Sequence, residues 1–405
     1  MRDEVPAETF IGYHAREIDG DWVDYADFIE GHSTEEPDRP DISEDDEATI
    51  NYTSGTTGDP KGVVRTHRTE HWHALVLNQH MEIQDDDTYL WTLPMFHCNG
   101  WGHTYAITGT GGTHVCQRTF DAQGVFDRVR EYDVSFMCGA PTVLNNLIKY
   151  YQEHDDVVTT GDADLRIATA GSAPATATIE TVEDEFGWRI IHIYGLTETA
   201  PIITTSNSPR RLAQRGRDLK VKQGFETLAT DVRVVDEDGN DVARDGSTIG
   251  EIVVAGNQVM DRYLNKPEIT HDAFNARVEG YFHTGDLATM DEDGMVSIQD
   301  RKKDIIISGG ENISSIELED TLFDHEAVAD VAVIPSPSEK WGETPKAFVV
   351  PSNDDPQNPP VSEDELTEFT RERLAGYKVV HRVEFVNSLP KTATGKIQKY
   401  ELQEQ

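Results

Sequence analysis

At 405 residues the chain is long enough for two or three domains, and 37% apolar with 8% aromatic residues is typical of a globular protein. Its net charge of −40 comes from 75 acidic and 35 basic residues spread along the chain, which argues against binding to nucleic acid. Such charge repels itself in dilute buffer but is screened at about 1 M salt, where the Debye length is roughly 3 Å. We therefore expect a protein of a high-salt cytoplasm, with an ordinary acidic protein as the alternative.

The three cysteines, Cys98, Cys116 and Cys138, show no C-x-x-C spacing. This argues for a reducing compartment and against a disulfide framework or a structural zinc site. The charged start of the sequence does not have the apolar stretch of a signal peptide, and no apolar run has the length of a membrane span. The expected location is the cytoplasm.

Residues 1–47 are polar and acidic and are expected to form a lead and linker before an apolar strand that begins near Ala48. The loop YTSGTTGDPKG follows at residues 52–62. Glycines let backbone N–H groups converge on an anion, and hydroxyl groups and Lys61 add donors and charge, so phosphate is the expected ligand. The spacing is not that of a Walker loop, and a surface turn is the alternative for this loop alone.

Residues 113–195 alternate short apolar runs with helical patterns, which predicts a largely parallel sheet covered by helices. Helices are expected over 120–132, 141–151 and 175–186. Ligands of such sheets lie beyond the carboxyl ends of the strands, where GSAPA (171–175) and YGLTET (194–199) occur.

After Gly224 the pattern becomes all-β, beginning with a hairpin predicted over 230–242 around the turn DEDGN. After Asp300 strands, an acidic proline-rich linker and a helix capped by Ser362 and Glu365 indicate a small α+β domain. The predicted fold is α/β: a large domain over 48–300 with a mostly parallel sheet and a β-rich subdomain, then a small α+β domain over 301–405.

Five separated motifs occur in one order along the chain, and together they resemble the acyl-adenylate-forming superfamily of acyl-CoA synthetases, adenylation domains and beetle luciferases. The motifs are YTSGTTGDPKG, YGLTET, GYFHTGDLA, DRKKDIIISGGENISSIELE and PKTATGKIQK. They span residues 52–399, and five ordered motifs are far more specific than any one of them.

The resemblance implies a site for ATP and Mg²⁺. Thr197 would reach the α-phosphate, Glu198 would bind Mg²⁺ together with Thr56, and Asp286 and Arg301 would hold the ribose. The phosphate loop would hold pyrophosphate through Ser54, Gly55, Thr56, Thr57, Gly58 and Lys61. The adenine would lie against Gly171, Ser172, Ala173, Pro174, Tyr194 and Gly195.

The resemblance also implies a reaction in two halves, with ATP and coenzyme A as co-substrates. Lys396 would stabilise charge on the phosphoryl oxygens while a carboxylate attacks the α-phosphorus. The C-terminal domain would then rotate about Lys303, and Gly309 and Gly310 would line the pantetheine tunnel.

The stretch LPMFHCNGWGH (93–103) resembles acyl-CoA synthetases of fatty or short substituted aliphatic acids, with His97 as a catalytic residue and Trp101 beside it in the acyl pocket. Two metal sites are weighed against this interpretation. The set His97, Cys98 and His103 does not have a fourth ligand or the usual spacing. His67-Arg-Thr-Glu70-His71 matches an inverted zinc-protease pattern, but an exposed histidine-rich helix is the simpler interpretation.

The phosphate loop follows only a short lead, so much of the family's N-terminal subdomain is expected to be missing, which leaves a face for a partner or a second copy. The predicted function is an AMP-forming acyl-CoA synthetase acting on a small-molecule carboxylic acid. The alternatives are an adenylation domain that loads a carrier protein and a nonproductive nucleotide-binding remnant.

Overall fold

The computed structural model describes residues 9–13, 22–53, 60–161, 164–208, 215–338, 340–391 and 397–403. The chain divides into two compact units, residues 1–43 and 44–405. In the first unit β1 (Ile11–Gly12) pairs in parallel with β2 (Val23–Asp24), and the short helix α1 (Tyr25–Ile29) follows. The acidic lead thus contains short elements that its composition did not predict.

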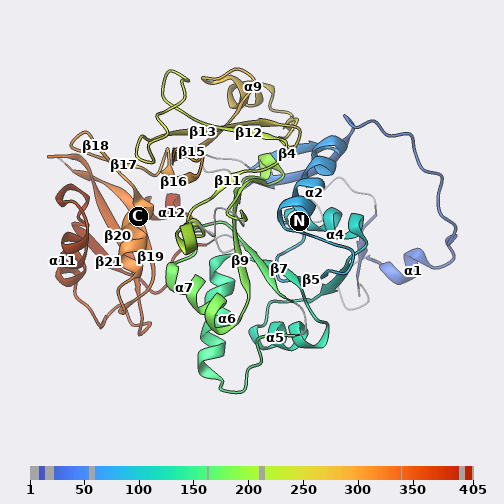
Figure 1. Ribbon diagram of the computed structural model, residues 1–405, viewed down its shortest axis with the longest axis horizontal. Coiled ribbons are helices and arrows are strands. Elements are labelled where there is room, and N and C mark those ends of the chain that lie inside the picture. Colours follow the sequence, from blue (N-terminus) through green and yellow to red (C-terminus); the bar gives the residue numbers. More distant parts are fainter. Residues whose placement is uncertain are drawn as a thin grey trace. The chain divides into compact units, whose positions relative to one another are not determined.

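The second unit is built on a seven-stranded sheet with the order β11-β10-β9-β8-β7-β5-β6 (Figure 1). The strands from β6 to β9 are parallel, whereas β10 and β11 are antiparallel, so the predicted mostly parallel sheet is confirmed. Strand β5 was not predicted, although it lies inside the sheet between β6 and β7. The strands are β5 (Thr88–Trp91), β6 (Thr113–Cys116), β7 (Phe136–Gly139), β8 (Arg166–Thr169), β9 (Arg189–Gly195), β10 (Ile202–Thr205) and β11 (Phe225–Glu226).

Helices cover both faces of this sheet because side chains along each strand point alternately to opposite sides. Tyr89 and Trp91 of β5 pack with α2 (His67–His80) and α4 (His103–Thr110), whereas Leu90 packs with the helices of the other face. These are α5 (Ala122–Glu131), α6 (Pro141–Glu153) and α7 (Thr176–Glu180), which lie together in Figure 1. All three were predicted, and α7 continues as a π-helical turn, Thr181–Glu185.

A smaller sheet lies on both sides of the predicted phosphate loop in the sequence. Strand β3 (Glu47–Thr53) forms an antiparallel hairpin with β4 (Lys61–Thr66), and β14 (Arg262–Tyr263) pairs with the other edge of β4. Lys61 therefore stands at the first position of β4, opposite Thr53. Ser54, Gly55, Thr56, Thr57 and Gly58 lie outside the described residues.

The β-rich region is an antiparallel sheet in the order β12-β13-β15-β16. The predicted hairpin over 230–242 is present but short: its turn at 236–240 is closed by the bridge between Val235 and Asp241 and by a hydrogen bond from the Val242 N–H to the Val234 carbonyl at 3.0 Å. The longer ladder of β12 is formed with β13, over six consecutive residue pairs. The strands are β12 (Thr230–Val235), β13 (Gly250–Gly256), β15 (Phe282–Met290) and β16 (Val296–Arg301).

The C-terminal part forms a five-stranded sheet, drawn in orange and red in Figure 1. Helices α10 (Ser315–Phe323) and α11 (Glu363–Arg373) pack on one face and α12 (Lys399–Gln403) on the other. The predicted capping box is present, because the Ser362 hydroxyl accepts from the Glu365 N–H and the Ser362 N–H donates to the Glu365 carboxylate. The strands are β17 (Ile306–Ser308), β18 (Glu311–Ile313), β19 (Val328–Ser338), β20 (Gly342–Pro351) and β21 (Arg382–Phe385).

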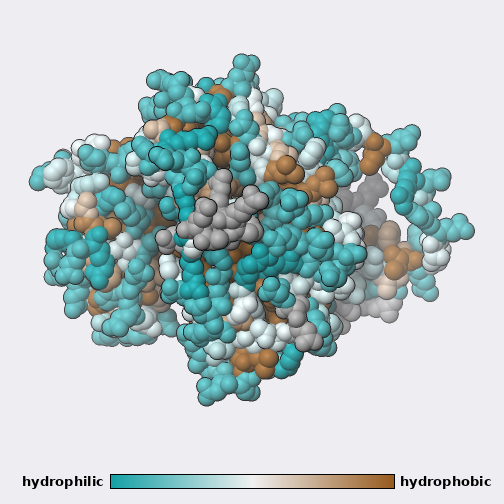
Figure 2. Space-filling model, in the orientation of Figure 1, coloured by the Kyte–Doolittle hydropathy of each residue, from teal (hydrophilic) through white to brown (hydrophobic). Residues whose placement is uncertain are grey.

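Polar residues dominate the face shown in Figure 2, in keeping with the net charge of −40. Within the described parts of the chain, no helix is long and apolar enough to cross a membrane. All three cysteines are free, and Cys116 is exposed whereas Cys98 and Cys138 are buried.

One buried ion pair ties the starts of the parallel strands to the end of α2. The Arg166 guanidinium contacts the Asp87 carboxylate and donates to the carbonyls of Met81 (2.8 Å) and Glu82 (2.6 Å). Asp87 also accepts from the Gln84 N–H and the Ser135 hydroxyl. Because both charges are buried and fully hydrogen-bonded, loss of one partner would leave the other uncompensated.

Replacing Arg166 with methionine, which has a similar length, should lower the free energy of unfolding by about 3–5 kcal/mol. The exposed pair between Arg371 and Glu368 supplies the control, and Arg371→Met should change stability by about 1 kcal/mol or less. Chemical denaturation in molar salt measures both variants. A loss for Arg166→Met no larger than that of the control would contradict the proposed role of the pair.

Candidate nucleotide site

The carboxyl end of β9 brings three of the predicted nucleotide residues together. The Tyr194 hydroxyl donates to Asp286 Oδ2 at 2.7 Å, and Arg301 Nε lies 3.4 Å from Asp286 Oδ1. Asp286 and Arg301 face each other across β15 and β16, and Tyr194 and Asp286 are 9% and 5% exposed. Burial, reinforced by the Asp286 carboxylate, raises the pKa of Tyr194 well above its usual value, so the phenol remains a neutral donor.

Gly195, the last residue of β9, is needed for the turn that follows. A Cβ atom there would lie 1.6 Å from the Pro201 carbonyl oxygen, so only glycine lets the chain turn back into β10 so closely. A short 3-10 helix, Thr197–Thr199, fills the turn, and the Leu196 N–H donates to the Thr199 hydroxyl at 2.9 Å. Thr197 and Glu198 are thus fixed just beyond the strand end.

The GSAPA segment follows β8, the strand next to β9 in the sheet. Gly171 and Ser172 are exposed, Ala173 is half-buried and Pro174 is buried. Gly171 has a φ of +98°, which favours glycine, and a Cβ there would meet no atom within 4 Å. The segment therefore leaves open space at the same sheet edge as Tyr194.

Glu198 and Lys61 both contact Tyr263, a residue that the sequence motifs did not indicate. The Tyr263 hydroxyl donates to Glu198 Oε1 at 2.8 Å, and Lys61 Nζ lies 4.8 Å from the centroid of the Tyr263 ring. Tyr263 is 4% exposed and Glu198 is 8% exposed. The group expected to bind Mg²⁺ and the lysine of the phosphate loop are therefore joined through Tyr263.

Thr197 contacts the predicted acyl segment through Cys98, because Cys98 Sγ lies 2.9 Å from Thr197 Oγ1. Burial raises the pKa of the Cys98 thiol to about 11. His97 is half-buried, whereas Trp101 is 6% exposed and packs in the core between the sheet, α2 and α4. The structure thus places the predicted acyl segment beside the predicted catalytic threonine.

The chain over Cys98–Gly102 is left-handed at five successive residues, with φ between +48° and +77°. Non-glycine residues adopt this region at a cost of roughly 1–2 kcal/mol each. Asn99 offsets part of this cost, since its amide donates to Glu70 Oε1 and accepts from Asn51, both at 3.1 Å. Strained backbone of this kind clusters at ligand sites.

In the motif His67-Arg-Thr-Glu70-His71 on α2, Glu70 has a structural role. Glu70 is buried, with its Oε1 atom 3.1 Å from Nε of the fully buried Arg65, and it accepts from Thr49 at 2.6 Å. His71 is exposed, but His73 is fully buried, so the expectation of an exposed histidine-rich helix is wrong for one face of α2. Within the residues that the structure describes, no three His, Cys, Asp or Glu side chains are arranged to hold a metal ion.

The predicted hinge lies where β16 ends. The Asp300 carboxylate accepts from the Ser315 N–H at 2.5 Å, and Lys302 Nζ lies 3.6 Å from Glu251. Lys303 is exposed at the residue level, with Nζ 3.9 Å from Asp304, and partial burial of its amine lowers its pKa. These contacts cross the predicted boundary at residue 300.

Lys396 lies outside the described residues, but both ends of its loop are anchored. Lys391 forms a bridge with Ile397, and the Gln398 N–H donates to the Pro390 carbonyl at 2.8 Å. Lys399 is then held by Glu319 at 2.7 Å and by the Ser315 hydroxyl at 2.6 Å. The base of the loop is thus tied through Ser315 to Asp300, the neighbour of Arg301.

Gly309 and Gly310 form the two-residue turn between β17 and β18, with φ values of +61° and +92°. Such a turn requires positive φ at both positions, which explains the glycine pair. The Gly309 N–H donates to the Trp341 carbonyl at 2.8 Å, so the turn lies beside the loop between β19 and β20.

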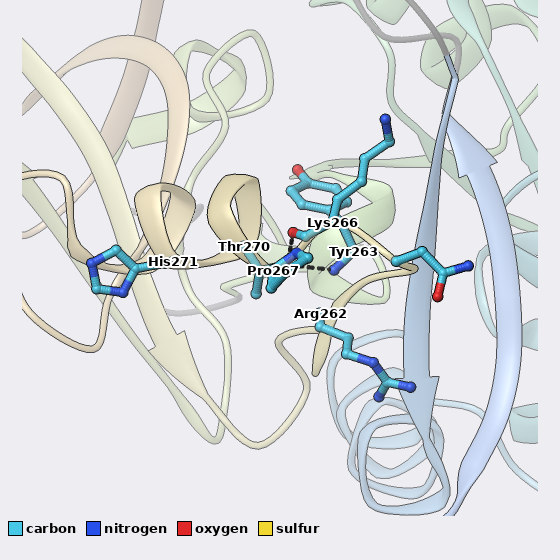
Figure 3. A pocket seen from close by; sticks show the side chains of 7 residues that line it. Arg262, Tyr263, Lys266, Pro267, Thr270 and His271 are labelled. Atoms are coloured by element: carbon cyan, nitrogen blue, oxygen red, sulfur yellow. Dashed lines mark hydrogen bonds between the residues drawn. The ribbon is translucent and has the colours of Figure 1, made fainter.

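A surface cavity of about 420 Å³ lies beside Tyr263, at the start of α9 (Pro267–Asn275). Figure 3 shows that the basic side chains of Arg262 and His271 point away from each other around it. Arg262 is also engaged by Glu47 and Asp261. These basic side chains are therefore not arranged to bind a single anionic ligand in the cavity.

Comparison with known proteins agrees with this geometry. The profile of the AMP-binding enzyme family matches residues 4–264, and that of the AMP-binding enzyme C-terminal domain matches residues 317–396. The chain belongs to the AMP-binding enzyme family. The acyl-adenylate-forming resemblance drawn from the five motifs is thereby confirmed.

Curated relatives include acetate–CoA ligase CCL3 of Humulus lupulus, which is 40% identical over 94% of this chain and 67% of its own length. The 2-methylpropanoate–CoA ligase CCL4 of the same plant is 41% identical over 89% of this chain and 64% of its own. The chain thus spans about two thirds of the length of these relatives.

The chain is also similar to solved structures. ATP-bound MatB from Rhodopseudomonas palustris has a TM-score of 0.80 and 29% identity over 90% of this chain and 69% of its own. The o-succinylbenzoate CoA synthetase MenE from Bacillus subtilis, in complex with ATP and a magnesium ion, has a TM-score of 0.78 and 29% identity, covering 91% of this chain and 73% of its own.

Sequence reasoning missed Tyr263, the contact of Cys98 with Thr197 and the pairing of Arg65 with Glu70. Tyr263 stands in DRYLNKPEIT, where only Pro267 gives a local signal, that of a helix start. Its contact with Glu198 joins residues 65 positions apart, and no spacing in the sequence reveals it.

Thiol labelling tests the packing of Cys98 against Thr197. At pH 8 a thiol with a pKa of about 11 is only about 0.1% thiolate, so Cys98 should react orders of magnitude more slowly than an exposed thiol. In the native protein one thiol, that of Cys116, should react in a fast phase, and Cys116→Ser should abolish this phase. A fast phase that persists in Cys116→Ser would contradict the burial of Cys98, and unfolded protein, in which all three thiols react, supplies the control.

Proposed function

We propose that the protein is an AMP-forming acyl-CoA synthetase acting on a short or fatty aliphatic carboxylic acid. The observation that carries the proposal is the connected set Tyr194–Asp286–Arg301, with Thr197 and Glu198 two and three residues beyond the end of β9. Aromatic, carboxylate and guanidinium groups suit the adenine and ribose. Relatives named as CoA ligases at about 40% identity support the same activity.

In the first half-reaction a substrate carboxylate oxygen would form a bond to the α-phosphorus of ATP, and the bond to the β-phosphate oxygen would break to release pyrophosphate. Thr197 would donate to the α-phosphate. Lys61 would neutralise the departing phosphates, together with Ser54, Gly55, Thr56, Thr57 and Gly58. Lys396 would meet the charge that develops on the phosphoryl oxygens.

The carboxylate of Glu198 and the hydroxyl of Thr56 are hard oxygen donors, which fit Mg²⁺. When bound, the ion would supply positive charge to the phosphates. Tyr194 and Gly195, with Gly171, Ser172, Ala173 and Pro174, would enclose the adenine, while Asp286 and Arg301 would bind the ribose.

In the second half-reaction the thiolate of coenzyme A would attack the acyl carbon, and AMP would leave. We propose that residues 301–405 rotate about Lys303 between the two steps, so that Gly309 and Gly310 come to line the pantetheine tunnel. His97 and Trp101 would border the acyl group, which the contact between Cys98 and Thr197 supports.

The test is carboxylate- and CoA-dependent release of AMP and pyrophosphate in molar salt, across a panel from acetate to long-chain acids. Lys396→Ala should lower adenylation by about 10²–10³-fold, because it removes one fixed cation from the transition state. Lys149→Ala, an exposed lysine on α6, is the control and should leave the rate unchanged. A normal rate in Lys396→Ala would refute the assignment.

The same assay decides between the alternatives. Faster transfer to a pantetheinylated carrier protein than to coenzyme A would favour a carrier-loading adenylation domain. Tight ATP binding with no carboxylate-dependent pyrophosphate exchange would favour a nonproductive nucleotide-binding remnant.

We also propose that the protein works in a salt-rich, reducing cytoplasm. The support is the charge of −40 and three free cysteines. Raising KCl from about 0.1 M to about 1 M shortens the Debye length from roughly 10 to 3 Å, so the thermal midpoint should rise steeply. A midpoint that stays constant or falls over this range, measured by circular dichroism, would contradict the proposal.

A further inference from the structure

Tyr263 stands between the two charged groups that the proposed function assigns to the phosphates and to Mg²⁺. Its hydroxyl donates to Glu198 Oε1 at 2.8 Å, and its ring lies under Lys61, with Nζ 4.8 Å from the centroid. Lys61 ends the phosphate loop, whereas Glu198 follows β9 of the large sheet. One side chain therefore links two structurally separate parts of the site.

The backbone around Tyr263 is held from three sides. Tyr263 pairs with Val63 in the ladder between β14 and β4. The Tyr263 N–H donates to the Thr270 hydroxyl at 3.0 Å, a contact drawn in Figure 3. Three residues earlier, the Met260 N–H donates to the Glu198 carbonyl at 2.7 Å. The distance between the tyrosine and the Glu198 backbone is therefore fixed by the fold.

This arrangement gives the phenol two separable tasks. A carboxylate with one oxygen held by a buried donor keeps a fixed plane, and such donors behind a ligating carboxylate typically tune metal affinity by about 10–100-fold. The ring face attracts an ammonium group through its quadrupole, which limits where Lys61 Nζ lies. Burial raises the pKa of the Tyr263 phenol, with Glu198 adding to the effect, so the hydroxyl keeps its proton.

We propose that Tyr263 is a positioning residue that orients the Glu198 carboxylate for the metal ion through its hydroxyl and holds Lys61 toward the phosphates through its ring. The inference rests on the proposed function, because it takes the roles of Glu198 and Lys61 from it. It adds a residue outside the five motifs to the machinery, with two contacts that can be removed one at a time.

Two substitutions separate the contacts. Tyr263→Phe keeps the ring and removes only the hydroxyl, whereas Tyr263→Leu removes both. The control is Tyr281→Phe, which removes a similar hydrogen bond, from the Tyr281 hydroxyl to Asp231 at 2.6 Å, on the surface of the β-rich region.

Binding of Mn²⁺ with a nonhydrolysable ATP analogue is followed by electron paramagnetic resonance, and adenylation is followed as a function of Mg²⁺ and ATP concentration. Tyr263→Phe should raise the half-saturating Mn²⁺ and Mg²⁺ concentrations by about 10–100-fold, with kcat nearly restored at saturating Mg²⁺. Tyr263→Leu should in addition raise the KM for ATP by several-fold, and Tyr281→Phe should change none of these values.

A merely structural role would lower the thermal midpoint of Tyr263→Phe without moving its metal dependence, and that result would overturn the inference. A protein that binds Mn²⁺ and nucleotide but adenylates no acid would overturn the proposed function, while the resonance measurement would still decide the role of Tyr263. Failure of the unaltered protein to bind Mn²⁺ with nucleotide would overturn both.

Discussion

The hydrogen bond between Tyr194 and Asp286 is the contact on which the arrangement of the site depends. It joins the last parallel strand of the large sheet to a strand of the antiparallel sheet, in a setting where both side chains are almost completely buried. A buried carboxylate is costly unless it is hydrogen-bonded and paired, and here Tyr194 and Arg301 meet both needs. Arg301 ends β16, so the same contact holds the end of this strand beside β9.

A second constraint acts just beyond the end of β9. Tyr263 binds Glu198 from the small sheet that also carries Lys61, and Cys98 binds Thr197 from the segment before α4. Two separate regions, the small sheet and the segment before α4, thus converge on Thr197 and Glu198. Since each contact comes from a different element, the geometry at these two residues depends on distant parts of the chain and not only on the motif that contains them.

How far the sequence predicts the structure depends on whether the signal is local. The apolar runs of β7, β8 and β9 and the helices between them could be predicted because the pattern repeats within each segment. Strand β5 was missed because its four residues run directly into the motif LPMFHCNGWGH, and β15 because the polar residues HTGD interrupt it. The turn after β12 was predicted because its signal is local, whereas the ladder of β12 with β13 was not, because the two strands are joined by no local pattern.

The same distinction holds for the site. Ordered motifs identified Tyr194, Asp286 and Arg301, and these residues lie in contact. Burial of Arg65, Glu70 and His73 on α2 and β4 could not be predicted, because charged residues are buried only where distant partners meet them. The buried pair Arg65–Glu70 and the half-buried Asn51 form a polar cluster that contacts Asn99 of the predicted acyl segment, whereas hydropathy alone would place these residues at the surface.

Asn99 lies within the left-handed segment from Cys98 to Gly102, where its effect on stability differs from its effect on the local backbone conformation. Glycine at this position would relieve torsional cost while forfeiting the amide contacts to Glu70 and Asn51, two effects of comparable size and opposite sign. The substitution would therefore change the free energy of unfolding little, although the backbone beside Thr197 would become more flexible. Asn99 therefore contributes more to the local shape of the chain beside Thr197 than to the free energy of unfolding.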